Sequence, residues 1–548
     1  MKVDALMLNA CKQAFSFTPR ELALILIGGL GFFWGFPNSL GQPPAALPSP
    51  ALLFTFSLAG LALTAKGSTK AAAGAICTFI MGGLLATYWL SYPMINFGQV
   101  PLPLAFIFLI LMGVALSVYY VIFVLLLRFF QVRLPLALAL IAGGLTWGAL
   151  EFFRGSLFTG LTWFSLSSAM MGRPIWAQGA SLVGMFGLSS VYALAALLFI
   201  PLLLRRCGLE IGKKTFWLCP LTGCLLLAAL PLYGGVRLHY ADMPPDEGRR
   251  DIILAQAQGN IDQAQKWQPE MQAATVRHYV LLSEKALNQA EEKFGRQADL
   301  LVWPETAMPF YFQPDSRLAA PLRALTAERG IPLLFGAPGM DMGPDGQESY
   351  NRVWLLNEQG DVSGHYDKEH LVPFGEYIPK GFYVPFASEF LQGYGFTPGQ
   401  TKEPLRLRDI SLGVLICYEG IFPELAQARV AAGANLLVNV SNDAWFADSP
   451  APWQHLQLSA MRAIEQGRYM LRCTNTGVSA LIDPLGRIQD AGPLFQSYVS
   501  SYKIKGGLLE EKTFFHRHYA LITRITAYSP LFFIGLSLIM PLIRRRRR

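Results

Sequence analysis

The sequence predicts a membrane-spanning α-helical bundle of about eight helices joined to an α/β domain. The first reason is composition: the 548 residues are 52% hydrophobic and only 15% charged, with a mean hydropathy of +0.34, which is too apolar for a water-soluble chain of this length. The second is distribution, because nearly every long apolar run lies before residue 240. We therefore expect a bundle at 1–240, an α/β domain at 241–518, and a C-terminal membrane helix with an arginine tail at 519–548.

Eight segments can be interpreted as membrane spans, since a span needs roughly 20 mostly apolar residues. They lie at 21–40, 50–65, 71–92, 103–127, 134–152, 177–204, 216–236 and 519–543. The second segment is the shortest. The first is not followed by a small-residue cleavage site, and further spans come after it, so we interpret it as a span and not as a signal peptide.

Lysine and arginine residues between the spans predict the orientation of the bundle. The clusters are Lys2, Lys12 and Arg20 before span one, Lys66 and Lys70 after span two, Arg128 and Arg133 after span four, Arg205, Arg206, Lys213 and Lys214 after span six, and arginines 544–548 after span eight. All of these clusters fall on one side, and positive charge marks the cytoplasmic side. Residues 241–518 then lie outside, which in a bacterium is the periplasmic face of the inner membrane.

The basic character of the chain could suggest nucleic-acid binding, because the net charge is +8 and the isoelectric point is about 9.0. However, the arginines at 544–548 suit a topology anchor beside a bilayer. The sequence contains no Walker-type or Rossmann glycine loop and no basic patch interleaved with aromatic residues. We expect no nucleic acid among the partners.

One outer loop, between spans five and six, differs from the others in its charge. It carries Glu151, Arg154, Phe158, Trp163 and Arg173. Charged residues at a span boundary either belong to a solvated loop or face the interior of the bundle for a functional reason. Both interpretations stay open.

Residues 250–510 alternate between short β-rich runs and helical patterns, as α/β domains do. Strands are predicted at 251–258, 299–303, 331–336, 350–357, 410–417, 435–442 and 478–484, and helices at 271–294, 316–329, 423–432 and 453–466. The central strands are apolar on both faces, so we expect helices to cover them.

Three residues at or near predicted strand ends suggest acyl-transfer chemistry. Cys417 ends the apolar run ISLGVLIC, Glu305 lies in LVWPET, where the proline turns the chain out of the sheet, and Lys368 lies in HYDKEHLVPFGEY. A cysteine nucleophile needs a base for its proton and a cation or N–H group for the oxyanion, roles that suit Glu305 and Lys368 respectively. The structural alternatives are a helix N-terminal acid for Glu305 and a solvated charged turn for Lys368.

Two other arrangements of Cys417 stay open. One is a Cys–His dyad with His365, His370 or His455 as the base, and the other is a disulfide with Cys473. No His, Cys or carboxylate cluster has metal-ligand spacing, so the sequence implies no metal and no cofactor.

The order and type of the three candidates resemble the nitrilase superfamily of carbon–nitrogen hydrolases. In that superfamily the catalytic set is Glu, Lys and Cys, matched here by Glu305 in WPE, by Lys368 and by the strand-end Cys417. The resemblance implies an αββα sandwich for residues 241–518.

The membrane part extends this resemblance, since the chain is also similar to the apolipoprotein N-acyltransferase family of bacterial membrane enzymes. The similar segments are WGALEFFRG and FTGLTW within 147–163, QGNIDQAQKW, LVWPET, YDKEHLVPFGEYIP, ICYEGIFPE, VSNDAWFADS and QHLQLSAMRAIEQGR. The similarity implies that Trp267, Glu376, Tyr418 and Glu419 support the triad. Glu376 and Glu419 would orient Lys368 and the nucleophile loop, and Trp267 would contact an acyl chain or headgroup.

The reaction that this resemblance implies has two stages. The Cys417 thiolate, formed by Glu305, attacks the sn-1 ester of a phospholipid, expected to be phosphatidylethanolamine, and the resulting thioester is passed to the α-amine of the diacylglyceryl-cysteine of an apolipoprotein. Lys368 and a backbone N–H near Cys417 would hold both oxyanions, and the kinetics would be ping-pong. The expected partners are a phospholipid donor, a diacylated apolipoprotein acceptor and the lipid bilayer, and we expect a monomer without cofactor.

Two alternative functions compete with this one. A membrane-tethered amidase of the nitrilase type would use the same triad with water as the acceptor. A transporter or scaffold is disfavoured because the spans contain few acidic residues and no evident pair of broken helices. Segment 377–396, rich in aromatic residues, is interpreted as a mobile lid that dips into the headgroup region, with an ordinary packed loop as the alternative.

Overall fold

The computed structural model describes residues 13–42, 48–241, 250–343, 346–379 and 395–546. The chain divides into two compact units, one formed by Met1–His239 with Arg517–Arg548 and the other by Tyr240–His516. The described part of the first unit is helical, and the second combines helices with β-sheets.

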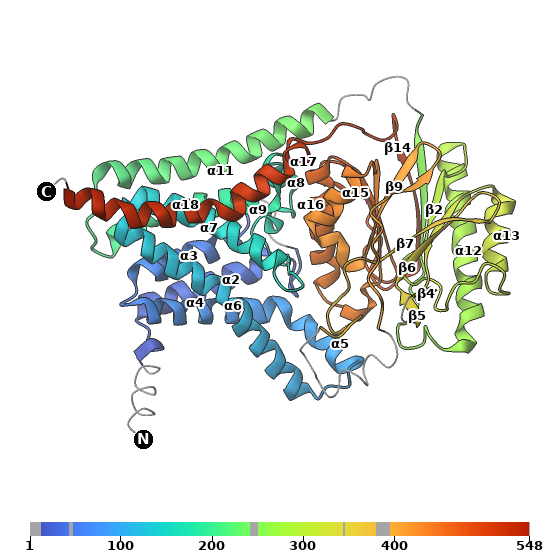
Figure 1. The fold of residues 1–548 in the computed structure, drawn as a ribbon, viewed down its shortest axis with the longest axis horizontal. Coiled ribbons are helices and arrows are strands. Elements are labelled where there is room, and N and C mark those ends of the chain that lie inside the picture. Colours follow the sequence, from blue (N-terminus) through green and yellow to red (C-terminus); the bar gives the residue numbers. More distant parts are fainter. Residues whose placement is uncertain (1–12, 43–47, 242–249, 344–345, 380–394, 547–548) are drawn as a thin grey trace. The chain divides into compact units, whose positions relative to one another are not determined.

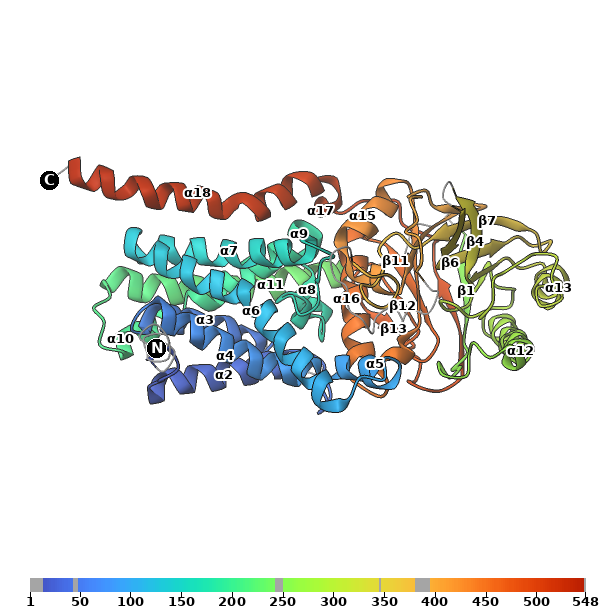
Figure 2. The ribbon, with the colours of Figure 1, turned by 60° about the horizontal axis from the view of Figure 1, so that its bottom comes forward.

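The first unit is a bundle whose long helices run side by side (Figure 1, Figure 2). Its helices are α2 Pro19–Gly35, α3 Ala51–Thr64, α4 Ser68–Thr87, η1 Tyr88–Leu90, α5 Ser91–Asn96, α6 Leu102–Arg133, α7 Leu136–Ser156, η2 Ser168–Met170, α8 Pro174–Ala177, α9 Ala180–Leu197, α10 Ile200–Arg206, α11 Lys213–Ala241, which ends just past the unit boundary, and α18 Tyr519–Arg546.

Helices stand at all of the predicted span positions. By length and composition, six described stretches could cross a membrane: Ser68–Asn96, Leu102–Arg133, Leu136–Ser156, Ala180–Arg206, Lys213–Tyr240 and Tyr519–Ile543. Helix α2 has 17 residues, at the lower end of the usual range, and α3 has 14, which corresponds to only about 21 Å against a hydrocarbon core of about 30 Å. The predicted span at 50–65 is therefore an apolar helix that is short for a crossing.

The predicted sixth span is not one straight helix. Its backbone leaves the helical conformation at Gly184, where φ is 67°, and α10 begins as a separate helix at Ile200. A positive φ is accessible to glycine without steric cost. The apolar pattern found the segment but could not show the break.

Aromatic rings fill the interior of the bundle. Phe32 lies 4.9 Å from Phe54, Phe79 lies 4.7 Å from Tyr120, and Phe54 lies 5.9 Å from Trp147, measured between ring centroids. Other large apolar side chains point outward from α6, namely Leu102, Leu104, Phe106, Ile107, Phe108, Ile110, Leu111, Val114 and Val118. An apolar outer face of this extent is typical of a helix that lies against lipid.

The second unit contains two six-stranded sheets and one two-stranded ribbon. Its strands are β1 Ile252–Gln258, β2 Leu300–Val302, β3 Leu333–Gly336, β4 Gly339–Gly343, β5 Gly346–Tyr350, β6 Arg352–Leu356, β7 Val362–Asp367, β8 Leu405–Leu407, β9 Ile410–Ile416, β10 Leu436–Ser441, β11 Tyr469–Thr474, β12 Ala480–Ile482, β13 Ile488–Gln489 and β14 Tyr498–Ile504. Its helices are α12 Pro269–Phe294, α13 Ala320–Arg329, η3 Cys417–Ile421, α15 Pro423–Ala431, η4 Asp443–Phe446, α16 Ala451–Gln466 and α17 Phe514–Arg517.

These elements form an αββα sandwich. The first sheet has the order β14-β1-β2-β3-β6-β7 and the second the order β13-β12-β11-β10-β9-β8. Helices α12 and α13 lie on the first sheet and α15 and α16 on the second, as the layers in Figure 1 show. Apolar residues of both sheets, such as Leu254 and Val302 with Val414 and Val438, pack together between them.

The predicted strands and helices of this unit are all present, with ends shifted by a few residues. The αββα sandwich that the family resemblance implied is confirmed, since each sheet has helices on one face and the other sheet on its second face. The apolar pattern alone led us to expect helices over the central strands, and they cover only one face of each sheet. An apolar strand face shows only that something covers it, and a second sheet does so as well as a helix. The strands that the sequence did not predict are mostly short or half-exposed, with β4, β5, β7 and β8 among them.

Candidate active site

The three predicted catalytic residues follow three different strands. Glu305 comes shortly after β2, Lys368 directly after β7 and Cys417 directly after β9, so both large sheets contribute. All three side chains are buried, with relative exposures of 6%, 1% and 9%. The structure brings them into one cluster. Lys368 Nζ lies 3.5 Å from Glu305 Oε1, and the charges of both residues affect the pKa of the Cys417 thiol.

Lys368 is held between two carboxylates. Its Nζ donates to Oε1 of Glu376 at 2.9 Å and lies 3.5 Å from Oε1 of Glu305. Burial alone would lower the pKa of Lys368, but Glu376 and Glu305 outweigh it and hold the pKa above its ordinary value. Lys368 is therefore a permanent cation and not part of a solvated turn.

Cys417 has a strained backbone and a protonated side chain. Its φ of 52° lies in the left-handed region, which costs a residue with a side chain about 1 kcal/mol or more. Burial, and then the charge of Glu305, raise the pKa of Cys417 above its ordinary value, although Lys368 acts in the opposite direction. The thiol is therefore neutral at rest and needs a base before it can attack a substrate.

Glu305 is positioned by two groups that the sequence did not reveal. Its Oε1 accepts a hydrogen bond from Nδ2 of Asn351 at 2.8 Å, and its Oε2 accepts one from the backbone N–H of Asn442 at 2.9 Å. No helix begins at Glu305, because the next described helix, α13, starts at Ala320, so the helix-dipole alternative is wrong. Asn442 directly follows β10 and could have been found by the same strand-end argument that found Cys417.

Glu376 and Glu419 connect the loops of the site. Glu376 accepts from Lys368 and, at 2.7 Å, from Asn351 through Oε1, and from the Val372 N–H through Oε2. Glu419 is fully buried and accepts from the Tyr366 hydroxyl and from the backbone N–H groups of residues 369, 370 and 416. It thereby joins the loop that carries Lys368 to the loop that carries Cys417.

The two aromatic candidates are half-buried. Trp267 closes the turn after β1, and Tyr418 packs edge-on against Phe422, with ring centroids 4.9 Å apart. Next to Trp267, Lys266 is only 1% exposed, although nothing in the local sequence indicates that this lysine is buried. Of the segment interpreted as a lid, residues 380–394 lie outside the described residues.

His455 does not act as a base toward Cys417. Its Nε2 lies 3.1 Å from the carbonyl oxygen of Cys417, and a carbonyl can only accept, so this nitrogen carries a proton and donates it. The other two histidines contact aromatic rings: His365 packs against Trp354, and His370 packs against Phe422. The contacts of these histidines do not support a Cys–His dyad.

The described cysteines are all free, so Cys417 and Cys473 form no disulfide in the structure. One group of described residues, Asp341, His365 and Asp367, has metal-ligand spacing. The guanidinium of Arg352 pairs with both of its carboxylates and compensates one of their two negative charges.

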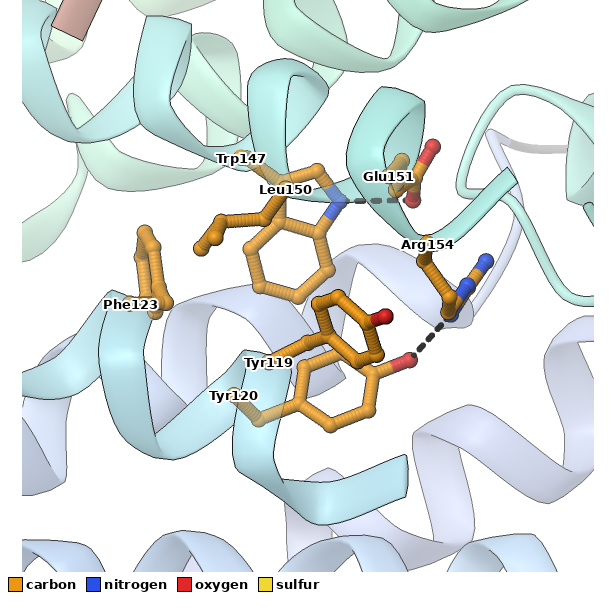
Figure 3. Close-up of a pocket in the computed structure, with 7 residues that line it drawn as sticks. All are labelled: Tyr119, Tyr120, Phe123, Trp147, Leu150, Glu151 and Arg154. Atoms are coloured by element: carbon orange, nitrogen blue, oxygen red, sulfur yellow. Dashed lines mark hydrogen bonds between the residues drawn. The ribbon is translucent and has the colours of Figure 1, made fainter. Parts of the chain in front are cut away.

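Buried hydrogen bonds hold the predicted outer loop of the first unit against the bundle interior. Glu151 and Arg154 are buried on α7 and line a pocket with Tyr119, Tyr120, Phe123, Trp147 and Leu150, as Figure 3 shows. Glu151 accepts from Trp147 Nε1 and from the Leu166 N–H, both at 2.8 Å. Arg154 donates to the Tyr120 hydroxyl and to the backbone carbonyl groups of residues 161 and 163. The interior-facing interpretation of these two residues is therefore correct, and Trp163 is also buried, whereas Phe158 is fully exposed.

Fold and cluster together define the class of the second unit. Residues 254–511 match the family model described as carbon-nitrogen hydrolase, and the unit is a carbon–nitrogen hydrolase domain. An amidase from Nesterenkonia sp. AN1, of the nitrilase superfamily, is similar over 52% of this chain and 98% of its own, with 20% sequence identity and a TM-score of 0.35.

The first unit and the full-length relatives narrow this class. Residues 28–198 match the model described as the apolipoprotein N-acyltransferase N-terminal domain. The apolipoprotein N-acyltransferase of Geobacter metallireducens is 35% identical over 500 residues, which cover 91% of this chain and 92% of that relative. That of Azotobacter vinelandii is 35% identical over 429 residues, covering 76% and 77%. The chain belongs to the apolipoprotein N-acyltransferase family, and it is a membrane protein.

Proposed function

We propose that this chain moves an acyl chain from the sn-1 position of a phospholipid, preferably phosphatidylethanolamine, through a thioester on Cys417 to the N-terminal amine of diacylglyceryl-cysteine in bacterial lipoproteins. One observation carries the proposal: a buried Glu305, Lys368 and Cys417 cluster lies in a domain that is inserted in the chain between two long apolar helices, α11 and α18. A hydrolase of soluble amides has no need for these helices.

In the first half-reaction the carboxylate of Glu305 takes the Cys417 proton, and the thiolate attacks the ester carbonyl carbon. The C–S bond forms, the ester C–O bond breaks, and the lysophospholipid alkoxide takes the proton back from Glu305. The negative oxygen of the tetrahedral intermediate lies against the Lys368 ammonium and the N–H of Tyr418. Each such donor is typically worth about 3 kcal/mol in the transition state.

In the second half-reaction the neutral α-amine of the lipoprotein attacks the thioester carbonyl. The C–N bond forms and the C–S bond breaks. Glu305 accepts the proton that the amine loses and passes it to the Cys417 sulfur, and the amide product leaves. Donor and acceptor therefore use one site in turn, which gives ping-pong kinetics.

The proposed setting follows from the substrates. Phospholipid and diacylated lipoprotein are both anchored in a bilayer, so a domain tethered by membrane helices suits them better than a soluble enzyme. The lysine and arginine pattern supports an inner-membrane protein with residues 241–518 on the periplasmic face. We propose that Trp267 and Tyr418 contact the lipid and that the chain acts as a monomer without cofactor.

Intact mass of the full chain incubated with phosphatidylethanolamine vesicles tests the proposal. We expect a fatty-acyl adduct that hydroxylamine removes. The adduct should be absent in Cys417→Ala and retained in Cys473→Ala, which is a matched control because Cys473 is a fully buried cysteine of the same domain. A membrane-tethered amidase would form no adduct from phospholipid, and a scaffold would not depend on Cys417 at all.

A further inference from the structure

A buried polar network lies behind Cys417, on the side of its backbone carbonyl. Two donors meet that oxygen, His455 Nε2 at 3.1 Å and Asn439 Nδ2 at 3.3 Å. Both side chains are buried, at 1% and 0% exposure. Neither donor contacts the thiol, so the chemistry described above does not use them.

Arg472 orients both donors at once. One terminal nitrogen of its guanidinium, NH1, donates to Oδ1 of Asn439, which turns the amide nitrogen of that residue toward Cys417. The other, NH2, donates to Oδ2 of Asp443 at 2.8 Å and lies 3.2 Å from Nδ1 of His455. Asp443 also contacts His455 Nδ1 at 3.0 Å. One fully buried arginine therefore fixes two donors on a single carbonyl.

The charge state of His455 fits a donor role. Burial, and then the nearby Arg472, lower the pKa of His455 below its ordinary value. Nε2–H donates to Cys417 in two states of the ring: the imidazolium, in which Nδ1–H donates to Asp443, and the neutral Nε2–H tautomer, in which Nδ1 accepts from Arg472. The donor is then present across the whole physiological pH range.

The carbonyl of Cys417 and the N–H of Tyr418 belong to the same peptide unit. Hydrogen bonds to an amide carbonyl increase the polarity of its N–H, and in a dry environment each such bond strengthens the next by roughly 10–30%. The left-handed φ of Cys417 is a strained conformation that persists only when its surroundings hold it. Under the proposed function, both effects act on the peptide unit whose N–H holds the oxyanion.

We propose that His455 and Asn439 are positioning residues that polarise the peptide between Cys417 and Tyr418, so that the Tyr418 N–H becomes a stronger donor to the oxyanion. This rests on the proposed function, in which that N–H and Lys368 hold the negative oxygen. The alternative role, aiming the thiol, would affect every reaction of Cys417 equally.

Two rates measured on one preparation separate these roles. Acylation of Cys417 by phosphatidylethanolamine vesicles passes through an oxyanion, whereas alkylation of Cys417 by iodoacetamide displaces iodide and has no oxyanion. Both are followed at the Cys417 peptide by mass spectrometry, and alkylation of the fully buried Cys473 in the same digest measures the unfolded fraction, for which both rates are corrected. We expect His455→Phe to lower acylation about threefold and to leave alkylation unchanged, because the oxyanion donor loses roughly 10–30% of its strength.

Three variants complete the test. His455→Gln restores an amide donor and is expected to recover most of the ratio, and Asn439→Ser removes the second donor and should lower it. His516→Phe is the matched control, since His516 is a buried histidine of the same unit bonded to Gln466, and its ratio should equal wild type.

An unchanged ratio in His455→Phe and Asn439→Ser overturns the inference, and so does an equal fall of both rates. Both outcomes leave the proposed function standing as long as wild type forms the adduct. A wild-type chain that forms no acyl adduct at Cys417 overturns the proposed function and this inference together.

Discussion

Lys266 is a buried lysine near Glu305, and it has no assigned role in the proposed reaction. It is 1% exposed, and burial lowers its pKa to about 8 even though the charge of Glu305 acts in the opposite direction. A lysine buried in this way binds its proton less tightly in the folded chain than in the unfolded chain. The folded protein therefore carries an electrostatic cost at neutral pH.

Replacing Lys266 by methionine should remove that cost. Between pH 8 and pH 10.5 the unfolded state binds more protons at this residue, so the wild-type free energy of unfolding rises with pH by about 3 kcal/mol relative to the variant. We expect Lys266→Met to melt above wild type in detergent at pH 7, with the gap closing as pH approaches 10.5. A gap that stays constant over this range would contradict the assignment, and the titration of Cys417 cancels because both proteins share it.

Reactive residues could be predicted from local patterns, and the family resemblance pointed to Glu376 and Glu419 beside them, but the other residues that position the site could not be predicted. Cys417 and Glu305 were predicted because each follows a predicted strand, whereas Lys368 was predicted from its motif, since strand β7 before it was not predicted. Asn351 carries no such signal, although it donates to both Glu305 and Glu376. Its role depends on two loops meeting, which no local pattern encodes.

At the scale of elements, the turn that presents Glu305 is defined by a close approach of β3. A Cβ atom on Gly336 would lie 2.3 Å from the Thr306 nitrogen and 2.7 Å from the Glu305 Cα. These are backbone atoms that cannot move aside cheaply, and Thr306 itself has a φ of 49°. Glycine at 336 is thus a condition for the position of Glu305.

Gly336→Ala should displace the Glu305 turn. We expect a loss of acyl transfer of at least tenfold and a destabilisation of about 1–3 kcal/mol, the usual range for overpacking. Turnover with phosphatidylethanolamine vesicles and thermal unfolding of the same sample measure both. Gly364→Ala, in β7 of the same sheet, is the matched control, because the nearest atom to its Cβ is a flexible Leu405 methyl carbon at 3.1 Å. Wild-type turnover in Gly336→Ala would refute the argument.

At the scale of the whole molecule, the orientation in the membrane remains a prediction from charge. The positive clusters alternate with apolar helices along the chain and place residues 241–518 outside the cytoplasm. The proposed function depends on this orientation, because lipoproteins mature on the periplasmic side.

Cysteine labelling tests the orientation. Met342 in β4 is 81% exposed, and Lys66, in the connection between α3 and α4, is also exposed. We expect Met342→Cys to react with a membrane-impermeant maleimide in intact spheroplasts, and Lys66→Cys to react only after the membrane is opened, each compared with the wild-type background. The reverse pattern would invert the predicted topology.

The sequence by itself determined the two-part architecture, the positions of the long helices and of half of the described strands, and the residue types of the candidate cluster. These follow from apolar length, from periodicity and from motifs, which are all local properties. The two sheets packed face to face were implied by the family resemblance and not by the apolar pattern. Only the tertiary structure decided that Glu151 and Arg154 turn inward, and that Asn351, Asn442, His455 and Arg472 surround the site. The physical reason is that each of these contacts joins residues far apart in the chain, and burial and hydrogen bonding depend on what the rest of the fold brings beside them.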